Sequence, residues 1–117
     1  MTTPTSIPTD QLPTPIRGYL AAHEARDADA ALRAFSPTAV VVDEGRTYRG
    51  TEEIRAFLLK GGADYTYTTE LVGAERVDDA RWVAVNHLEG NFPGGVVDLR
   101  YRFTMEDDLV AELVIAP

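Results

Sequence analysis

The fold is decided by the stretch Val96-Val97-Asp98-Leu99-Arg100-Tyr101-Arg102-Phe103-Thr104-Met105, which the turn sequence Glu106-Asp107-Asp108 follows. Apolar and charged residues alternate along it, as in a strand with one buried and one solvated face. Runs rich in β-branched and aromatic residues flank it over 65–77, 81–92 and 109–115. Turn sequences separate all four runs, so the second half of the chain is predicted to be a four-stranded antiparallel meander.

The first half of the chain shows the three- and four-residue spacing of helices. We expect a helix that begins at Pro13 or Pro15, a short helix over 30–35 that Asp29 caps, and a third helix that begins at Thr51 and ends at Gly61-Gly62. Short strands are expected between the second and third helices, over 38–43 and 46–48.

Residues 1–12 are rich in Thr and Pro and are expected to form a flexible N-terminal arm, with a single domain over 13–117. Helices followed by a run of strands indicate an α+β fold. We therefore predict a curved antiparallel sheet with three helices, all from the N-terminal half, packed on its concave face.

Composition excludes several classes of protein. The 117 residues carry 19 acidic and 11 basic side chains, a net charge of −8, which disfavours binding to nucleic acid or to an anionic membrane. No apolar stretch approaches the ~20 residues of a membrane span, and the lack of cysteine fits a cytoplasmic protein. Two separated histidines predict no metal site, and no nucleotide or flavin motif predicts a cofactor.

Asp43 is the first candidate for chemistry because it closes the apolar run Thr38-Ala39-Val40-Val41-Val42. A carboxyl group at the end of a buried strand is poorly hydrated, which raises its pKa and suits it to act as a base. Tyr19 and His23 lie one turn apart on the first predicted helix, on the face expected to point inward. Each has a structural alternative: Asp43 caps the turn at Glu44-Gly45, and Tyr19 and His23 are core residues.

The order of elements resembles the nuclear transport factor 2-like superfamily, and within it the SnoaL-like branch. The local sequence supports this at Ile16-Arg17-Gly18-Tyr19-Leu20, Asp27-Ala28-Asp29-Ala30-Ala31-Leu32, Ala39-Val40-Val41-Val42-Asp43 and Tyr48-Arg49-Gly50-Thr51-Glu52. The resemblance implies a cone-shaped cystatin-like roll that encloses an apolar cavity, and a homodimer formed through the outer face of the sheet. It does not select one function, because the superfamily includes isomerases, dehydratases, cyclases and binding modules.

Comparison with ketosteroid isomerase, a member of the superfamily, assigns possible roles. Asp43 matches the position of its catalytic base and Tyr19 that of its oxyanion-binding tyrosine. The third member, a protonated aspartate, has no counterpart, because Leu99 occupies its place and Asp98 is expected on the opposite face.

His23 is the substitute partner, expected either to bond to Asp43 or to supply a proton. The residues expected to contact a substrate are mostly apolar, and His87 is expected on the outer face: the substrate-contact set is Ile16, Phe57, Trp82, Asn86, Leu88, Leu99, Tyr101 and Phe103. We predict a cofactor-independent isomerase, cyclase or dehydratase that acts on a small hydrophobic carbonyl compound. The alternative is a non-catalytic module of the same fold that binds a hydrophobic ligand or serves for dimerisation.

Overall fold

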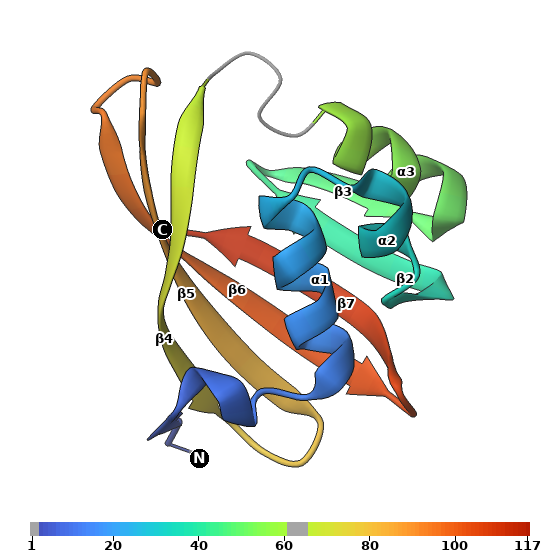
Figure 1. Cartoon of the computed structure of the whole chain (residues 1–117). Helices are drawn as coiled ribbons and strands as arrows, with labels where there is room; N and C mark the ends of the chain where they lie inside the picture. Colours follow the sequence, from blue (N-terminus) through green and yellow to red (C-terminus); the bar gives the residue numbers. More distant parts are fainter. Residues whose placement is uncertain (1–2, 61–65) are drawn as a thin grey trace.

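The computed structural model describes residues 3–60 and 66–117, and Figure 1 shows the helices lying against one long sheet. The elements follow the chain in this order: β1 Thr5–Ile7, η1 Thr9–Gln11, α1 Thr14–Glu24, α2 Ala28–Leu32, β2 Phe35–Asp43, β3 Arg46–Arg49, α3 Gly50–Lys60, β4 Tyr67–Arg76, β5 Arg81–Gly90, β6 Val96–Glu106 and β7 Leu109–Ala116. The predicted α+β class is confirmed.

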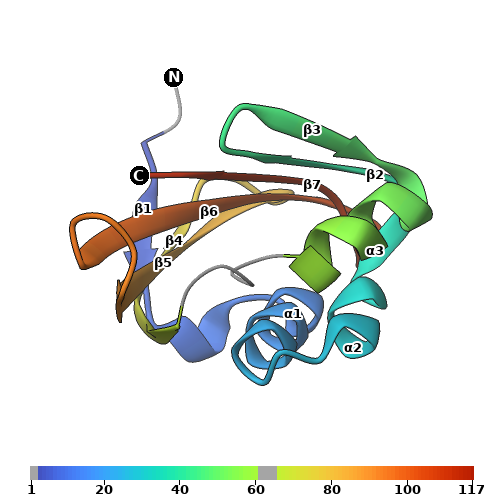
Figure 2. The same ribbon diagram turned by 90° about the horizontal axis from the view of Figure 1, so that it is seen from above.

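The strands form one sheet in the order β1-β4-β5-β6-β7-β2-β3. The predicted meander is confirmed, because β4, β5, β6 and β7 pair in sequence and antiparallel. Among the described strands only β2 and β7 pair in parallel, which joins the β2–β3 hairpin to the edge of the meander. Figure 2 shows that the sheet curves and that α1, α2 and α3 all lie on its concave side, as predicted.

The N-terminal segment contains elements that its composition did not indicate. Residues Thr5–Ile7 form β1, which pairs with β4 at the edge of the sheet. Leu12, at the end of this segment, has only 2% of its surface exposed. Backbone pairing with β4 and the burial of Leu12 hold this segment against the sheet, although a Thr- and Pro-rich sequence gives no periodic signal of it.

The second helix differs in its bounds from the prediction. α2 covers Ala28–Leu32, and its N-cap is Asp27, whose carboxylate accepts a hydrogen bond from the N–H of Ala30 at 3.1 Å. Phe35 begins β2 and does not end the helix, because its backbone pairs with Val110 of β7. The expected helix end at Gly61-Gly62 and the expected strand start at Tyr65 lie outside the described residues.

The core lies between α1 and the inner face of the sheet. Rows of directly opposed residues cross the strands on this face, one of them joining Trp82, Phe103, Leu113 and Val41. Ile16 and Tyr19 of α1 pack over these rows and are fully buried. Burial of each large apolar side chain contributes about 1.5–3 kcal/mol. Within residues 3–60 and 66–117, no helix has the length and apolar character needed to cross a membrane.

Candidate functional site

Asp43 lies on the inner face at the end of β2. It is directly opposite Ile115 of β7, which is in turn opposite Tyr101 of β6, so the three residues form one row across the sheet. Burial raises the pKa of the half-buried Asp43 carboxyl, and the adjacent Glu44 carboxylate raises it further. A hydrogen bond from the backbone N–H of Glu44 offsets part of this effect. When ionised, Asp43 is therefore a stronger base than an aspartate in water.

Tyr19 is held rigidly by aromatic neighbours. Its ring contacts the rings of Phe35 and Phe103 edge-on, with centroids 5.4 and 5.7 Å away, and stacks on His23 at 5.8 Å. The side chain is 0% exposed, and its hydroxyl has no hydrogen-bond partner among the described residues. A buried hydroxyl without a partner is energetically costly, so this group is an available donor for a ligand.

The Tyr19 hydroxyl lies in a cluster of other ionisable groups. Burial raises the pKa of Tyr19 well above its usual value, and Tyr101, Asp43 and Tyr67 add to the shift. The pKa of Tyr101 is also raised, first by burial and then by Tyr67 and Asp43. Both phenols therefore stay protonated at neutral pH and offer hydrogen bonds. We call Tyr19, Asp43, Tyr67 and Tyr101 the tyrosine–aspartate cluster.

His23 lies between Tyr19 and Tyr101, with its ring centroid 6.2 Å from that of Tyr101. Burial lowers the pKa of His23, and the nearby guanidinium of Arg26 lowers it further, so the imidazole is neutral at pH 7. In the described part of the chain no hydrogen bond joins His23 to Asp43, in contrast to one of the two roles expected from the sequence. His23 turns toward the sheet strand β6, where the ring packs with Tyr101.

The other predicted contact residues divide between this region and the core. Asn86 is 2% exposed, lies directly opposite Leu99, and has a side-chain nitrogen without a partner among the described residues. Its amide nevertheless lies near enough to Tyr101 to lower the pKa of that phenol slightly. Of the remaining residues, Ile16, Leu88 and Phe103 are buried in the core, where Phe103 contacts Tyr19. Phe57 contacts Tyr48, and Trp82 lies under the guanidinium of Arg76.

The outer face of the sheet carries the residues that the strand alternation assigned to it. His87 contacts Asp98 of the neighbouring strand at 2.6 Å, and this hydrogen bond raises the pKa of the imidazole. Arg100 pairs with Glu75 at 2.6 Å on the same face. These groups pair with one another on the side of the sheet away from the helices, so they do not belong to the candidate site.

A recess of about 180 Å³ lies between the helices and β4, and Tyr67 is the member of the tyrosine–aspartate cluster that forms part of its wall. His23 and Tyr67 contribute to its wall, together with residues of α1, α2, their connecting turn and α3: Ala22, Arg26, Asp27, Ala28, Ala31, Leu58 and Leu59. Sequence reasoning missed Arg26 and Tyr67. Tyr67 lies in a recognisable strand, but nothing in its spacing indicated that it faces Arg26.

A wider and shallower depression of about 360 Å³ lies on the outside, between α2 and α3. It is lined by Asp29, Leu32, Arg33 and Arg55, and the ion pair between Arg55 and Asp29 at 3.2 Å satisfies two of its charges. No member of the tyrosine–aspartate cluster reaches it, so we place the site at the smaller recess. The described residues contain no cluster of His, Asp and Glu that would hold a metal ion.

Comparison with known proteins agrees with the fold. Residues 16–113, most of the chain, match the SnoaL-like domain. The chain belongs to the SnoaL-like family. Among solved structures, this SnoaL-like protein is 31% identical to a candidate polyketide cyclase from Sinorhizobium meliloti, with a TM-score of 0.86; the match covers 94% of this chain and 100% of that one.

More distant structures share the fold of this SnoaL-like protein. A protein from Catenulispora acidiphila with a ketosteroid isomerase-like fold, solved with trimethylamine, is 16% identical with a TM-score of 0.78, and the match covers 92% of this chain and 87% of that one. A cystatin-fold protein from Novosphingobium aromaticivorans is 17% identical with a TM-score of 0.72, over 88% of this chain and 95% of that one. Curated proteins gave no match.

Proposed function

We propose that this SnoaL-like protein binds a small hydrophobic carbonyl compound against the inner face of the sheet and transfers a proton with Asp43 as the base. The observation that carries the proposal is the Tyr19 hydroxyl, fully buried and without a partner among the described residues, close enough to Asp43 for the two groups to interact electrostatically. Such a pair combines a hydrogen-bond donor for a carbonyl oxygen with an acceptor for the proton on the adjacent carbon.

The chemistry needs no cofactor. Asp43 removes a proton from the carbon next to the carbonyl, and the electron pair of that C–H bond forms a C=C bond while the carbonyl becomes an enolate. Tyr19 donates a hydrogen bond to the enolate oxygen, and neutral His23 is placed to support it. The protonated Asp43 then returns the proton to another carbon in an isomerase. In a cyclase, the enolate carbon attacks the carbon of a second carbonyl, the π electrons of that C=O bond move to its oxygen, and protonated Asp43 returns the proton to the resulting alkoxide.

One relative supports this class of reaction. The Sinorhizobium meliloti protein, 31% identical, carries a polyketide cyclase name. Cyclisation of a carbonyl compound proceeds through an enolate, which is the species that a base beside a hydrogen-bond donor would form.

The test is incorporation of deuterium from heavy water at the carbon next to the carbonyl in a panel of small ketones, measured by mass spectrometry. Removing a general base typically lowers the rate by about 10²–10⁴-fold, and we expect Asp43→Asn to lose a comparable factor. Asp98→Asn is the matched control, because this strand aspartate lies on the outer face and should leave the rate unchanged. Full incorporation by Asp43→Asn would refute Asp43 as the base.

A binding module is the second candidate, and one observation favours it. Leu99 lies on the inner face opposite Asn86 and occupies the position of the protonated aspartate of ketosteroid isomerase. The enolate would therefore have fewer hydrogen-bond donors than in that enzyme. A binding module predicts that ligands bind, that no deuterium is incorporated, and that Asp43→Asn leaves affinity nearly unchanged.

We also propose a homodimer formed through the outer face of the sheet. Valines alternate there with the paired charges, and several are only partly buried in the single chain: Val40, Val42, Val85 and Val114. Apolar side chains left half-exposed in the middle of a sheet are typical of a surface that a partner covers.

A further inference from the structure

Arg26 occupies an unusual position at the end of α1. The N–H of Asp27 bonds to the carbonyl of Ala22 at 2.8 Å, and the N–H of Arg26 bonds to the carbonyl of His23 at 3.1 Å. This is the Schellman arrangement, in which the residue at the Arg26 position is usually glycine because its φ is positive. Arg26 has a φ of 57°, which costs an L-residue about 1 kcal/mol. A strained residue of this kind at the wall of a recess suggests a function for its side chain.

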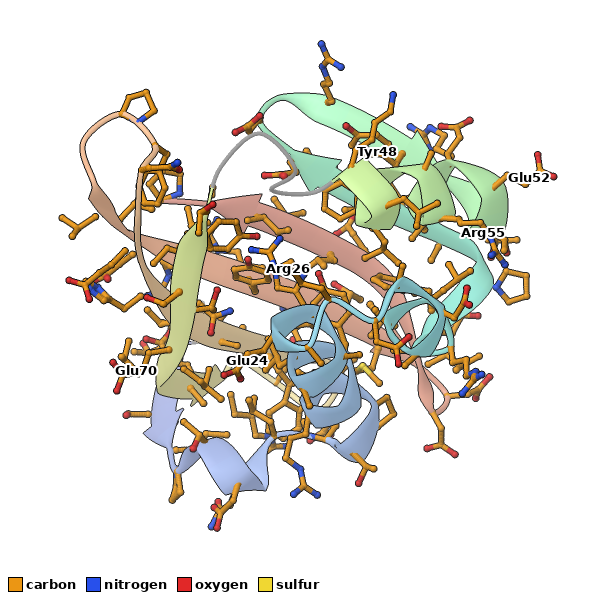
Figure 3. All side chains as sticks on the ribbon, turned by 45° about the horizontal axis from the view of Figure 1, so that its top comes forward. Glu24, Arg26, Tyr48, Glu52, Arg55 and Glu70 are labelled. Atoms are coloured by element: carbon orange, nitrogen blue, oxygen red, sulfur yellow. The ribbon has the colours of Figure 1, made fainter. Side chains whose placement is uncertain are left out.

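The guanidinium of Arg26 is fixed over the ring of Tyr67, with its central carbon 4.9 Å from the ring centroid. Figure 3 labels Arg26 near the end of α1, where its side chain can extend toward the sheet. Gly90 makes the position of Tyr67 possible, because a Cβ at residue 90 would come within 2.5 Å of the Tyr67 Cβ. The backbone therefore determines the position of both partners: the left-handed conformation places Arg26, and the glycine at position 90 leaves space for Tyr67.

The guanidinium of Arg26 has no carboxylate partner among the residues that the structure describes. By contrast, four other arginines form ion pairs with carboxylates elsewhere in the described part of the molecule: Arg55, Arg76, Arg81 and Arg100. The N–H groups of Arg26 are thus available at the recess, in a protein whose net charge is −8. A planar guanidinium fork is suited to a carboxylate, which it binds through two parallel hydrogen bonds.

The size of the recess limits the ligand. An apolar cavity of about 150 Å³ in a protein holds a molecule such as benzene, and the recess here measures about 180 Å³. The recess therefore has room for about one ring within its walls. His23 and Tyr67 line this recess, and the ring of Tyr19 stacks on that of His23, so the imidazole lies between the recess and the Tyr19 ring.

We propose that Arg26 binds the carboxylate of the ligand at the mouth of the recess, which makes the substrate a small keto acid of about one ring, its ketone directed toward Tyr19 and Asp43. The assignment of the ketone rests on the proposed function, whereas the binding of the carboxylate by Arg26 does not.

The test compares two probes that differ in charge and hardly in shape, 3-oxocyclohexane-1-carboxylate and its methyl ester. Dissociation constants are measured by calorimetry or NMR titration at pH 7.5. We expect the acid to bind about tenfold more tightly than the ester, because the interaction should be stronger than an exposed ion pair and weaker than a buried charged hydrogen bond. An acid that binds no better than the ester overturns the proposal.

Two substitutions separate charge from stability. Arg26→Gln removes the charge and keeps the strained φ, while Arg26→Gly removes the charge and relieves the strain, so it should raise the unfolding temperature. Both should lose the preference for the acid, and Arg33→Gln, an exposed arginine outside this recess, should retain it. Loss of preference in the more stable Arg26→Gly cannot come from unfolding. Preference retained in both Arg26 variants overturns the proposal.

A second measurement reports the position of the bound acid. Burial lowers the pKa of His23 and the Arg26 charge lowers it further, while the two rings that contact it, Tyr19 and Tyr101, are neutral at pH 7. A carboxylate on Arg26 should offset this effect, so the His23 pKa followed by NMR should rise with the acid and not with the ester. His87→Gln identifies the signal of the second histidine. An unchanged His23 pKa at saturating acid overturns the proposed position of the carboxylate.

Failure of this inference differs from failure of the proposed function. Arg26-dependent preference for the acid without deuterium incorporation would support the carboxylate site and reject proton transfer on these probes. Incorporation that depends on Asp43, equally fast for acid and ester and unaffected in Arg26→Gln, would support proton transfer and reject the carboxylate site.

Discussion

At the scale of single residues, the unpartnered hydroxyl of Tyr19 is the feature with the largest consequence. The ring is enclosed by Phe35, Phe103 and His23, so it cannot turn to bring the hydroxyl to water. The free protein therefore carries a desolvated polar atom that only a ligand or an internal water would satisfy. Stability and function make opposite demands on this atom.

Tyr19→Phe tests this conflict directly. Removing an unsatisfied buried hydroxyl should raise the free energy of unfolding by about 1–3 kcal/mol, while the enolate loses its principal donor and deuterium incorporation slows. Chemical denaturation and the mass-spectrometric assay measure the two effects on one preparation. A variant that is destabilised would mean that the hydroxyl makes a favourable interaction in the free protein.

Strand alternation was sufficient to assign single residues to the faces of the sheet. It placed Asn86, Leu99 and Tyr101 on the inner face and His87 and Asp98 on the outer one, because direction reverses at every residue of a strand. The contact of Arg26 with Tyr67 was beyond such reasoning. It joins a helix end to a distant strand and depends on a left-handed residue that no local pattern indicates.

At the scale of elements, the turn between β2 and β3 influences the chemistry of Asp43. Glu44 and Gly45 both have positive φ, 53° and 75°, as in the two-residue turns that favour Asn-Gly. A glutamate is therefore unfavourable in this turn, and its carboxylate raises the pKa of the adjacent Asp43.

Glu44→Asn should improve the turn and lower the pKa of Asp43 toward its usual value. Because the raised pKa means that the folded state holds the Asp43 proton more tightly than the unfolded state, stability falls as the pH rises from the usual carboxyl range through the raised pKa. In Glu44→Asn this loss of stability should be smaller. The acidic limb of the pH profile for deuterium incorporation should move to lower pH.

The pKa of Asp43 can be followed by carbon NMR and the stability by thermal unfolding between pH 3 and 7. An Asp43 pKa that does not change in Glu44→Asn would show that burial alone raises it. Glu52→Gln, on the exposed first turn of α3, is a control for the general loss of one negative charge.

The sequence also predicted the elements better than their ends. Helical spacing identified α1 and α3, but Asp27 rather than Asp29 caps α2, since both aspartates are suitable and only the three-dimensional path of the chain selects one. The parallel pairing of β2 with β7 was not predicted, because partner choice between distant strands leaves no mark in either one.

At the scale of the whole molecule, the outer face of the sheet should decide the oligomeric state. Val114 is opposite both Arg102 of β6 and Val42 of β2, near the middle of the face that we propose as the dimer surface. Val114→Lys should shift sedimentation from dimer to monomer, because it places a charge in an apolar contact.

Val96→Lys is the matched control for this experiment. Val96 is 57% exposed at the start of β6, beside the turn and away from the centre of the sheet, so the substitution should leave the dimer intact. A wild-type protein that sediments as a monomer at all concentrations would reject the dimer, and a dimeric Val114→Lys would place the contact elsewhere.

The parallel contact between β2 and β7 also governs when the molecule can be completed during its synthesis. The β2–β3 hairpin leaves the ribosome early, but its place in the sheet is beside β7, the last strand of the meander to be made. Until then Val41 and Asp43 have no β7 backbone beside them, and α1 has no complete surface to cover. The nascent chain therefore holds an apolar strand with one edge unpaired for seconds at usual rates of translation, about 5–20 residues per second, which is when a chaperone would have most to protect.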